Sequence, residues 1–157
     1  MHPNAQLVDR FYAAFAQRDA AAMAACYAPD AAFRDPAFDL AGADVGAMWA
    51  MLCARGKDLA LEWRDVRADD RAGSAHWEAR YTFSVTGRPV HNVIDAEFTF
   101  RDGWIATHVD RFDFWRWSRM ALGMKGALLG WSPLVRNAVR RQARRGLDAW
   151  IARGPAA

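Results

Sequence analysis

Two stretches of alternating side chains in the middle of the chain constrain its fold more than any other feature. In residues 76–85 and 91–100, apolar or aromatic side chains alternate with polar ones, and Gly87 and Pro89 lie between the two stretches. A period of two is the pattern of a β-strand with one buried face. Further alternation occurs at residues 59–63 and 104–114, and Asp102-Gly103 is typical of a hairpin turn. The sequence therefore predicts an antiparallel meander with one apolar face.

Three helical segments precede most of these strands and can cover their apolar face. We predict one helix over residues 5–17 with Asn4 as its cap, a second from an Asp19 cap to about residue 27, and a third over residues 42–55. A short strand is expected at residues 31–36, where a proline ends it. The expected fold class is α+β, with three N-terminal helices packed on a curved antiparallel sheet in an open cone.

Composition limits the number of domains and excludes several classes of protein. With 157 residues, of which 53% are hydrophobic and 13% aromatic, the chain suits one domain with a deep apolar interior. Cys26 and Cys53 are too few for a disulfide scaffold or a zinc site, and we expect neither a metal nor a cofactor. The sequence shows no secretory signal and no run of ~18 apolar residues, so a cytoplasmic protein is expected.

Several local strings carry a resemblance to a known family. Residues 27–36 read Tyr-Ala-Pro-Asp-Ala-Ala-Phe-Arg-Asp-Pro, and residues 98–105 read Phe-Thr-Phe-Arg-Asp-Gly-Trp-Ile. Together with residues 11–19, with Gly-Arg-Pro at 87–89 and with the order of the elements, they resemble the nuclear-transport-factor-2-like (NTF2-like) superfamily. The resemblance is to its ketosteroid-isomerase and SnoaL-like polyketide-cyclase branch. It implies a cone-shaped, cystatin-like domain over residues 1–114 with an internal cavity, but this fold hosts enzymes, binding modules and scaffolds alike.

The same resemblance implies candidate catalytic residues. The general-base aspartate of the isomerases, directly before a proline, falls on Asp35, whereas their two oxyanion donors fall on Phe11 and Ala96. Because neither of these side chains can donate a proton, efficient steroid isomerisation is not expected. His108 and Asp110 are in register to face the cavity from the last strand, where SnoaL-like cyclases place acid/base groups. We expect Asp35, His108 and Asp110 to form the catalytic cluster, with Asp35 or Asp110 as base and His108 as its partner or as the acid.

The cavity is expected to bind a small hydrophobic molecule. The candidate ligand-binding side chains are Phe11, Tyr12, Trp49, Trp77, Tyr81, Asn92, Ile94, Phe98 and Phe112. An enzyme of this kind would carry out cofactor-free isomerisation, cyclisation or hydration, including water activation for an epoxide. The alternative is a non-catalytic ligand-binding or dimeric assembly module. In that module Asp35 would serve only as a turn carboxylate, and His108 and Asp110 as a structural pair.

Residues 115–157 differ in charge from the rest of the chain. Their formal net charge is +8, whereas residues 1–114 carry −5. After Ser132-Pro133, apolar side chains follow a helical stripe opposite a row of arginines. We expect a basic amphipathic helical extension that packs on the domain or on a partner subunit of a homodimer. Association with a membrane surface is an alternative, while nucleic acid is not expected because no recognised binding module is present.

Overall fold

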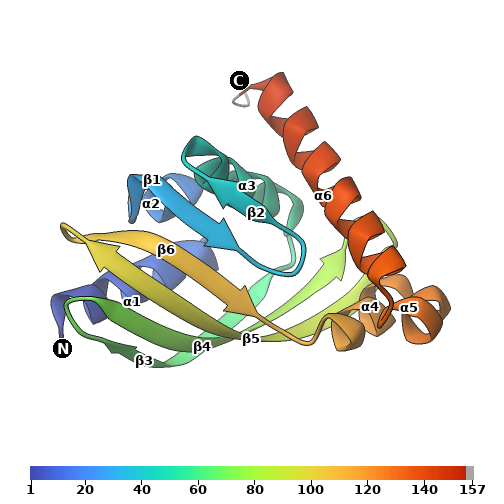
Figure 1. The fold of residues 1–157 in the computed structure, drawn as a ribbon, viewed down its shortest axis with the longest axis horizontal. Coiled ribbons are helices and arrows are strands. Elements are labelled where there is room, and N and C mark those ends of the chain that lie inside the picture. Colours follow the sequence, from blue (N-terminus) through green and yellow to red (C-terminus); the bar gives the residue numbers. More distant parts are fainter. Residues whose placement is uncertain (155–157) are drawn as a thin grey trace.

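The computed structural model describes residues 1–154 as one curved sheet with helices against one face and at one end (Figure 1). The helices are α1 (Pro3–Ala16), α2 (Ala20–Ala24), α3 (Ala43–Arg55), α4 (Phe114–Leu122), α5 (Met124–Leu129) and α6 (Pro133–Arg153). The strands are β1 (Tyr27–Arg34), β2 (Asp39–Ala41), β3 (Ala60–Ala68), β4 (Ala72–Phe83), β5 (Arg88–Arg101) and β6 (Trp104–Arg111). This arrangement confirms the predicted α+β class.

The sheet has the strand order β2-β1-β6-β5-β4-β3. All neighbouring strands are antiparallel except β1 and β6, which run parallel. Trp77 of β4 lies opposite Ile94 of β5, and Ala96 lies opposite Asp110 of β6. These side chains are all buried, so the alternation in the sequence does mark the inner face of the sheet.

The core lies where α1 and α3 close against the inner face of the sheet. Phe11 of α1 makes edge-to-face contacts with Tyr12, Tyr27 and Trp49, with ring centroids 5.1, 5.6 and 5.4 Å away, respectively. All four side chains are buried. Such offset aromatic packing stabilises a core beyond its buried area. One part of the cone is therefore filled with aromatic rings.

The C-terminal extension packs on the same chain. Helix α6 runs from α4 and α5 back past α3 (Figure 1). Arg144 places two guanidinium nitrogens 3.2 Å from Asp44 Oδ2, Arg140 Nε donates to Pro36 O at 2.9 Å, and Leu147 is fully buried. Within residues 1–154, none of the helices has the length and apolarity required to cross a bilayer.

Several element boundaries differ from the sequence-based expectation. Helix α2 ends at Ala24 rather than near residue 27, and β1 spans Tyr27–Arg34 rather than residues 31–36. Strand β6 ends at Arg111 rather than at residue 114, because the carboxylate of Asp113 accepts a backbone N–H in the next turn and caps α4. At the N-terminus, α1 begins at Pro3 and its cap is His2 rather than Asn4. Nδ1 of His2 accepts a hydrogen bond from the Asn4 backbone N–H at 3.1 Å. The side chain of Asn4 instead donates to Asp69 O.

Candidate active site

A cavity of about 670 Å³ lies between the inner face of the sheet, α3 and the C-terminal helices α4 and α6. This volume is within the usual range for small-molecule sites. Most of its wall is apolar, and two carboxylates, Asp35 and Asp110, are among its few polar groups. The predicted site residues on the wall are Asp35, Trp49, Trp77, Tyr81, Asn92, Ile94, Asp110 and Phe112.

Four predicted site residues do not line this cavity. His108, Phe11, Tyr12 and Phe98 are essentially inaccessible and belong to the packed core beside it. These side chains face the inside of the cone, as predicted, but they lie deeper in it than the residues on the cavity wall. His108 of β6 pairs with Phe98 on the neighbouring strand β5. The His108 ring also contacts the Phe11 ring, with 5.6 Å between the ring centroids. The structure therefore places these four side chains in the core and not on the cavity wall where ligand contact was expected.

Asp35 follows the end of β1 and enters the cavity from a tight turn. Its Oδ1 accepts hydrogen bonds from the backbone N–H groups of Ala37 and Phe38, each at 2.7 Å. Burial and then the charge of Asp110 raise the pKa of Asp35 to about 7. The two N–H donors and the guanidinium of Arg140 act in the opposite direction without cancelling this effect. Asp35 is therefore a carboxyl group that can be protonated near neutral pH.

Asp110 is held at the end of a buried hydrogen-bonded chain. Trp49 Nε1 donates to the Tyr27 hydroxyl at 2.9 Å, and that hydroxyl lies 2.7 Å from His108 Nδ1. His108 Nε2 is 2.9 Å from Asp110 Oδ1, which also accepts from Trp77 Nε1 at 3.2 Å. Burial raises the pKa of Tyr27, so its hydroxyl stays protonated.

These contacts define how the protons are arranged when His108 is neutral. Tyr27 donates to Nδ1 of His108, and the Nε2–H of His108 donates to Asp110. Both ring nitrogens are then in use, and the ring has no access to the cavity. The predicted pairing of His108 with Asp110 is present in the structure. The His108 ring therefore makes its hydrogen bonds inside the core, and one of them is to the carboxylate of Asp110 on the cavity wall.

Further cavity residues were not found by sequence reasoning. The wall includes Val139, Gln142, Ala143, Arg145 and Gly146, all on α6. Their signal in the sequence is the amphipathic stripe of α6, but a stripe does not show which surface it covers.

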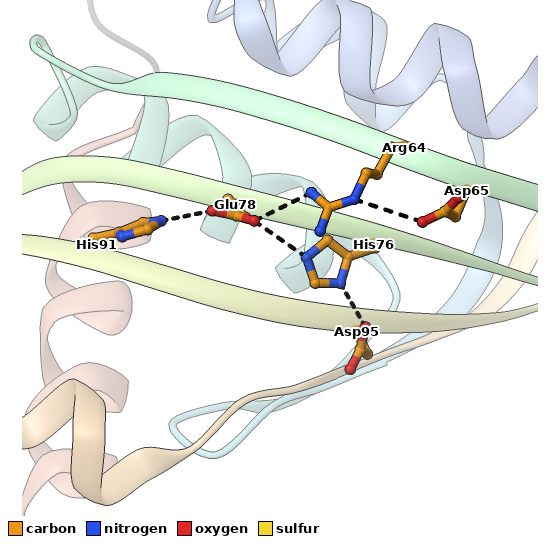
Figure 2. Close-up of polar contacts among 6 residues, drawn as sticks. All are labelled: Arg64, Asp65, His76, Glu78, His91 and Asp95. Atoms are coloured by element: carbon orange, nitrogen blue, oxygen red, sulfur yellow. Dashed lines mark hydrogen bonds and ion pairs between the residues drawn. The ribbon is translucent and has the colours of Figure 1, made fainter.

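A second polar cluster lies on the opposite face of the sheet, outside the cavity (Figure 2). Glu78 of β4 is its centre, with Oε2 2.7 Å from His91 Nε2 and Oε1 3.2 Å from Arg64 Nη1. His76 adds a contact to Glu78 at 3.4 Å and one to Asp95 at 2.8 Å. The hydrogen bonds from His91 and Arg64 lower the pKa of Glu78 to about 2. Among the described residues, no group of three His, Cys, Asp or Glu side chains is arranged to hold a metal ion.

Fold and cavity together define an NTF2-like α+β cone. The chain belongs to the SnoaL-like domain family, which it matches over residues 8–108. None of the curated proteins has a sequence that matches the chain significantly.

Solved structures with this fold include an NTF2-like protein of unknown function from Burkholderia pseudomallei K96243, 22% identical, with a TM-score of 0.65 over 76% of this chain and 98% of the other. An LEH-like epoxide hydrolase from M. tuberculosis is 17% identical, with a TM-score of 0.65 and coverages of 80% and 92%. A putative polyketide cyclase from Xanthomonas campestris pv. campestris is 24% identical, with a TM-score of 0.59 and coverages of 73% and 93%. At such identities the likeness shows the fold alone.

Proposed function

We propose that the protein binds a small hydrophobic molecule in its cavity and catalyses acid–base chemistry on it with Asp110 as base and Asp35 as acid. The observation that carries this proposal is the presence of two carboxyl groups in one largely apolar cavity. Their environments differ: Asp110 accepts two N–H hydrogen bonds on one oxygen, whereas the pKa of Asp35 is raised to about 7. Two titratable groups in unlike environments are the arrangement that divides acid and base tasks.

Asp110 is suited to remove a proton because its geometry is fixed. His108 and Trp77 both donate to Oδ1, and no hydrogen bond within residues 1–154 is made to Oδ2. The unpaired oxygen is the one available to a ligand or a water molecule. A general base must come within hydrogen-bonding reach of the proton that it removes, and a fixed carboxylate makes that position reproducible.

The carboxyl pair suits two related reactions. In epoxide hydration, Asp110 takes a proton from water as the water oxygen bonds to carbon, the carbon–oxygen bond of the ring breaks, and Asp35 protonates the released oxygen. Solvent then returns the proton from Asp110 to Asp35. In an isomerisation, Asp110 takes a proton from the carbon beside a carbonyl while Asp35 protonates the enolate oxygen; the enol then gives its O–H proton back to Asp35 as Asp110 protonates a different carbon. In a cyclisation, the enol carbon instead bonds to a second carbonyl carbon, the oxygen of that carbonyl takes the proton from Asp110, and the enol O–H proton returns to Asp35. The likeness to an epoxide hydrolase and a putative polyketide cyclase supports testing both reactions.

Two probes separate these reactions in one experiment. Styrene oxide in ¹⁸O-water reports hydration by label in the diol, and 2-tetralone in D₂O reports proton abstraction by deuterium at the α-carbon. We expect the wild-type protein to convert at least one probe. Asp35→Asn and Asp110→Asn should each lower the rate by about 10²-fold or more.

The control is Asp39→Asn, a variant of an exposed carboxylate on β2 that does not line the cavity. It should retain the wild-type rate. Full activity in both cavity variants would contradict the catalytic assignment. If the wild-type protein binds the probes in calorimetry but converts neither, the result would favour the alternative of a non-catalytic ligand-binding module.

A further inference from the structure

Helix α5 packs with Gly126, and with Gly130 directly after its last turn, against α4, while its large apolar side chains are exposed. A Cβ atom at Gly126 would lie 1.8 Å from Ser118 O of α4, and one at Gly130 would lie 2.1 Å from Ser118 Oγ. Contacts this close exclude any side chain at either position. The helix therefore cannot rotate to bury its larger residues against α4.

The outward side chains form an exposed apolar surface at one end of the molecule. We call it the apolar knob and define it as Met124, Leu128, Leu129, Trp131 and Leu134. The exposed fractions of Met124, Trp131 and Leu134 are 76%, 69% and 80%. Figure 1 shows α5 and the start of α6 at the end of the sheet away from the β5–β6 hairpin. Large apolar side chains that are exposed together in one short segment are typical of an interaction site.

The polar atoms in and beside the knob are already satisfied within the chain. Trp131 Nε1 donates to Leu128 O at 2.9 Å, and Trp115 Nε1 donates to Ala127 O at 3.1 Å. Ser132 Oγ donates to Leu129 O at 2.6 Å. Transfer of these groups out of water would leave none of these donors unpaired, which lowers its cost.

The segment of chain that carries the knob is basic. Residues 114–147 contain eight basic and no acidic residues, namely Arg116, Arg119, Lys125, Arg136, Arg140, Arg141, Arg144 and Arg145. Arg119 lies over the Trp115 ring at 4.6 Å, and Arg136 lies over the Phe114 ring at 5.3 Å. In the described part of the chain, Arg119, Lys125 and Arg136 make no ion pair with a carboxylate.

We propose that the apolar knob inserts into the surface of an anionic lipid bilayer, with Arg119, Lys125 and Arg136 at the level of the headgroups. An apolar tip with Trp and Leu, bordered by cations, has the composition of an interfacial membrane anchor. A second copy docked knob to knob would instead bring like charges together, which disfavours that arrangement. The anchor does not depend on the chemistry in the cavity.

Co-sedimentation of the full chain with vesicles tests the proposal. Vesicles of phosphatidylcholine with about one third phosphatidylglycerol should bind the protein, binding should fall with added salt, and vesicles of phosphatidylcholine alone should bind it far less. Leu128→Ser with Leu134→Ser should reduce partitioning by roughly tenfold or more, because exposed methylene groups supply the apolar part of binding. Lys125→Glu with Arg136→Glu should reduce it similarly by reversing two charges.

Matched controls lie elsewhere on the molecule. Trp104→Ser removes a 45% exposed tryptophan at the β5–β6 hairpin, and Arg80→Glu reverses an exposed charge on β4. Both should bind vesicles like the wild type, and circular dichroism should show that every variant is folded. The proposal would be overturned if the wild type did not sediment with vesicles, or if the controls lost vesicle binding as much as the knob variants. It would also be overturned if light scattering showed a dimer that the knob variants dissociate while the protein binds no lipid.

Discussion

The Tyr27 hydroxyl lies 2.7 Å from His108 Nδ1, and this contact directs the N–H of a neutral His108 ring at Asp110. A buried chain of donors that begins at Trp49 thus ends on a carboxylate at the cavity wall. Because every step of this chain is hydrogen-bonded, the position of Asp110 depends on residues that no ligand touches.

This chain predicts the tautomer of the neutral His108 ring. In ¹⁵N NMR, the neutral ring should carry its proton on Nε2 and not on Nδ1. Tyr27→Phe should lower the free energy of unfolding by about 1–3 kcal/mol, because Nδ1 and the Trp49 N–H both lose their partner. A proton found on Nδ1 instead would contradict the arrangement.

Asp35 should make stability depend on pH between about 4 and 7. Its pKa is raised from 3.8 to about 7 on folding, so the folded chain holds a proton that the unfolded chain releases in this range. Wild-type stability should therefore fall relative to Asp35→Asn as the pH rises, by up to about 1.4 kcal/mol per pH unit, and level off above 7. Urea denaturation across this range measures the difference. A constant difference between the two proteins would show that the carboxyl of Asp35 is not perturbed.

Glu78 should have the opposite dependence on pH. Its pKa is lowered from 4.5 to about 2 by His91 and Arg64, so its contribution to stability is complete above 4.5 and is lost as the pH falls toward 2. Glu78→Gln should be less stable than the wild type at pH 6, and the two proteins should converge in acid. A gap in denaturation midpoint that persists near pH 2 would argue against these contacts.

The buried hydroxyl of Tyr12 should lower the free energy of unfolding. Within the described residues it is the one fully buried side-chain oxygen or nitrogen without a hydrogen-bond partner. Tyr12→Phe should raise the free energy of unfolding by about 1 kcal/mol, since an unpaired buried polar group is unfavourable. Tyr81→Phe is the matched comparison and should lower it, because the Tyr81 hydroxyl accepts from Trp117 Nε1 at 2.9 Å. Destabilisation by Tyr12→Phe would point to a partner for that hydroxyl.

The wall contributed by α6 can be tested by filling the cavity. Ala143→Trp adds an indole to the wall, whereas Ala138→Trp adds the same group at an exposed position on the same helix. Calorimetric binding of 2-tetralone should weaken by about tenfold or more in the first variant and stay unchanged in the second. Equal affinities in both variants, with both proteins folded, would place the ligand elsewhere.

The cone and both carboxylates were predictable from the sequence because alternation and local strings are short-range signals. Asp35 is identified by the resemblance of residues 27–36 to the isomerase branch of the superfamily, and Asp110 by its register on the last strand. The depth of each residue in the cone was not predictable. His108 and Asp110 are two residues apart on one face of β6, yet the first is packed under α1 and the second reaches the cavity. Depth depends on how the helices close on the sheet, which is a long-range property.

Because α6 supplies one wall of the cavity, whereas Asp35 follows β1 and Asp110 lies on β6, the wall and the two carboxyl groups are encoded in separate stretches of the gene. Substitutions along the inner side of α6 can reshape the cavity without disturbing the turn that holds Asp35 or the strand that carries Asp110. Under the function proposed above, a lineage with this architecture would acquire new substrates through changes in its tail while it keeps both carboxyl groups.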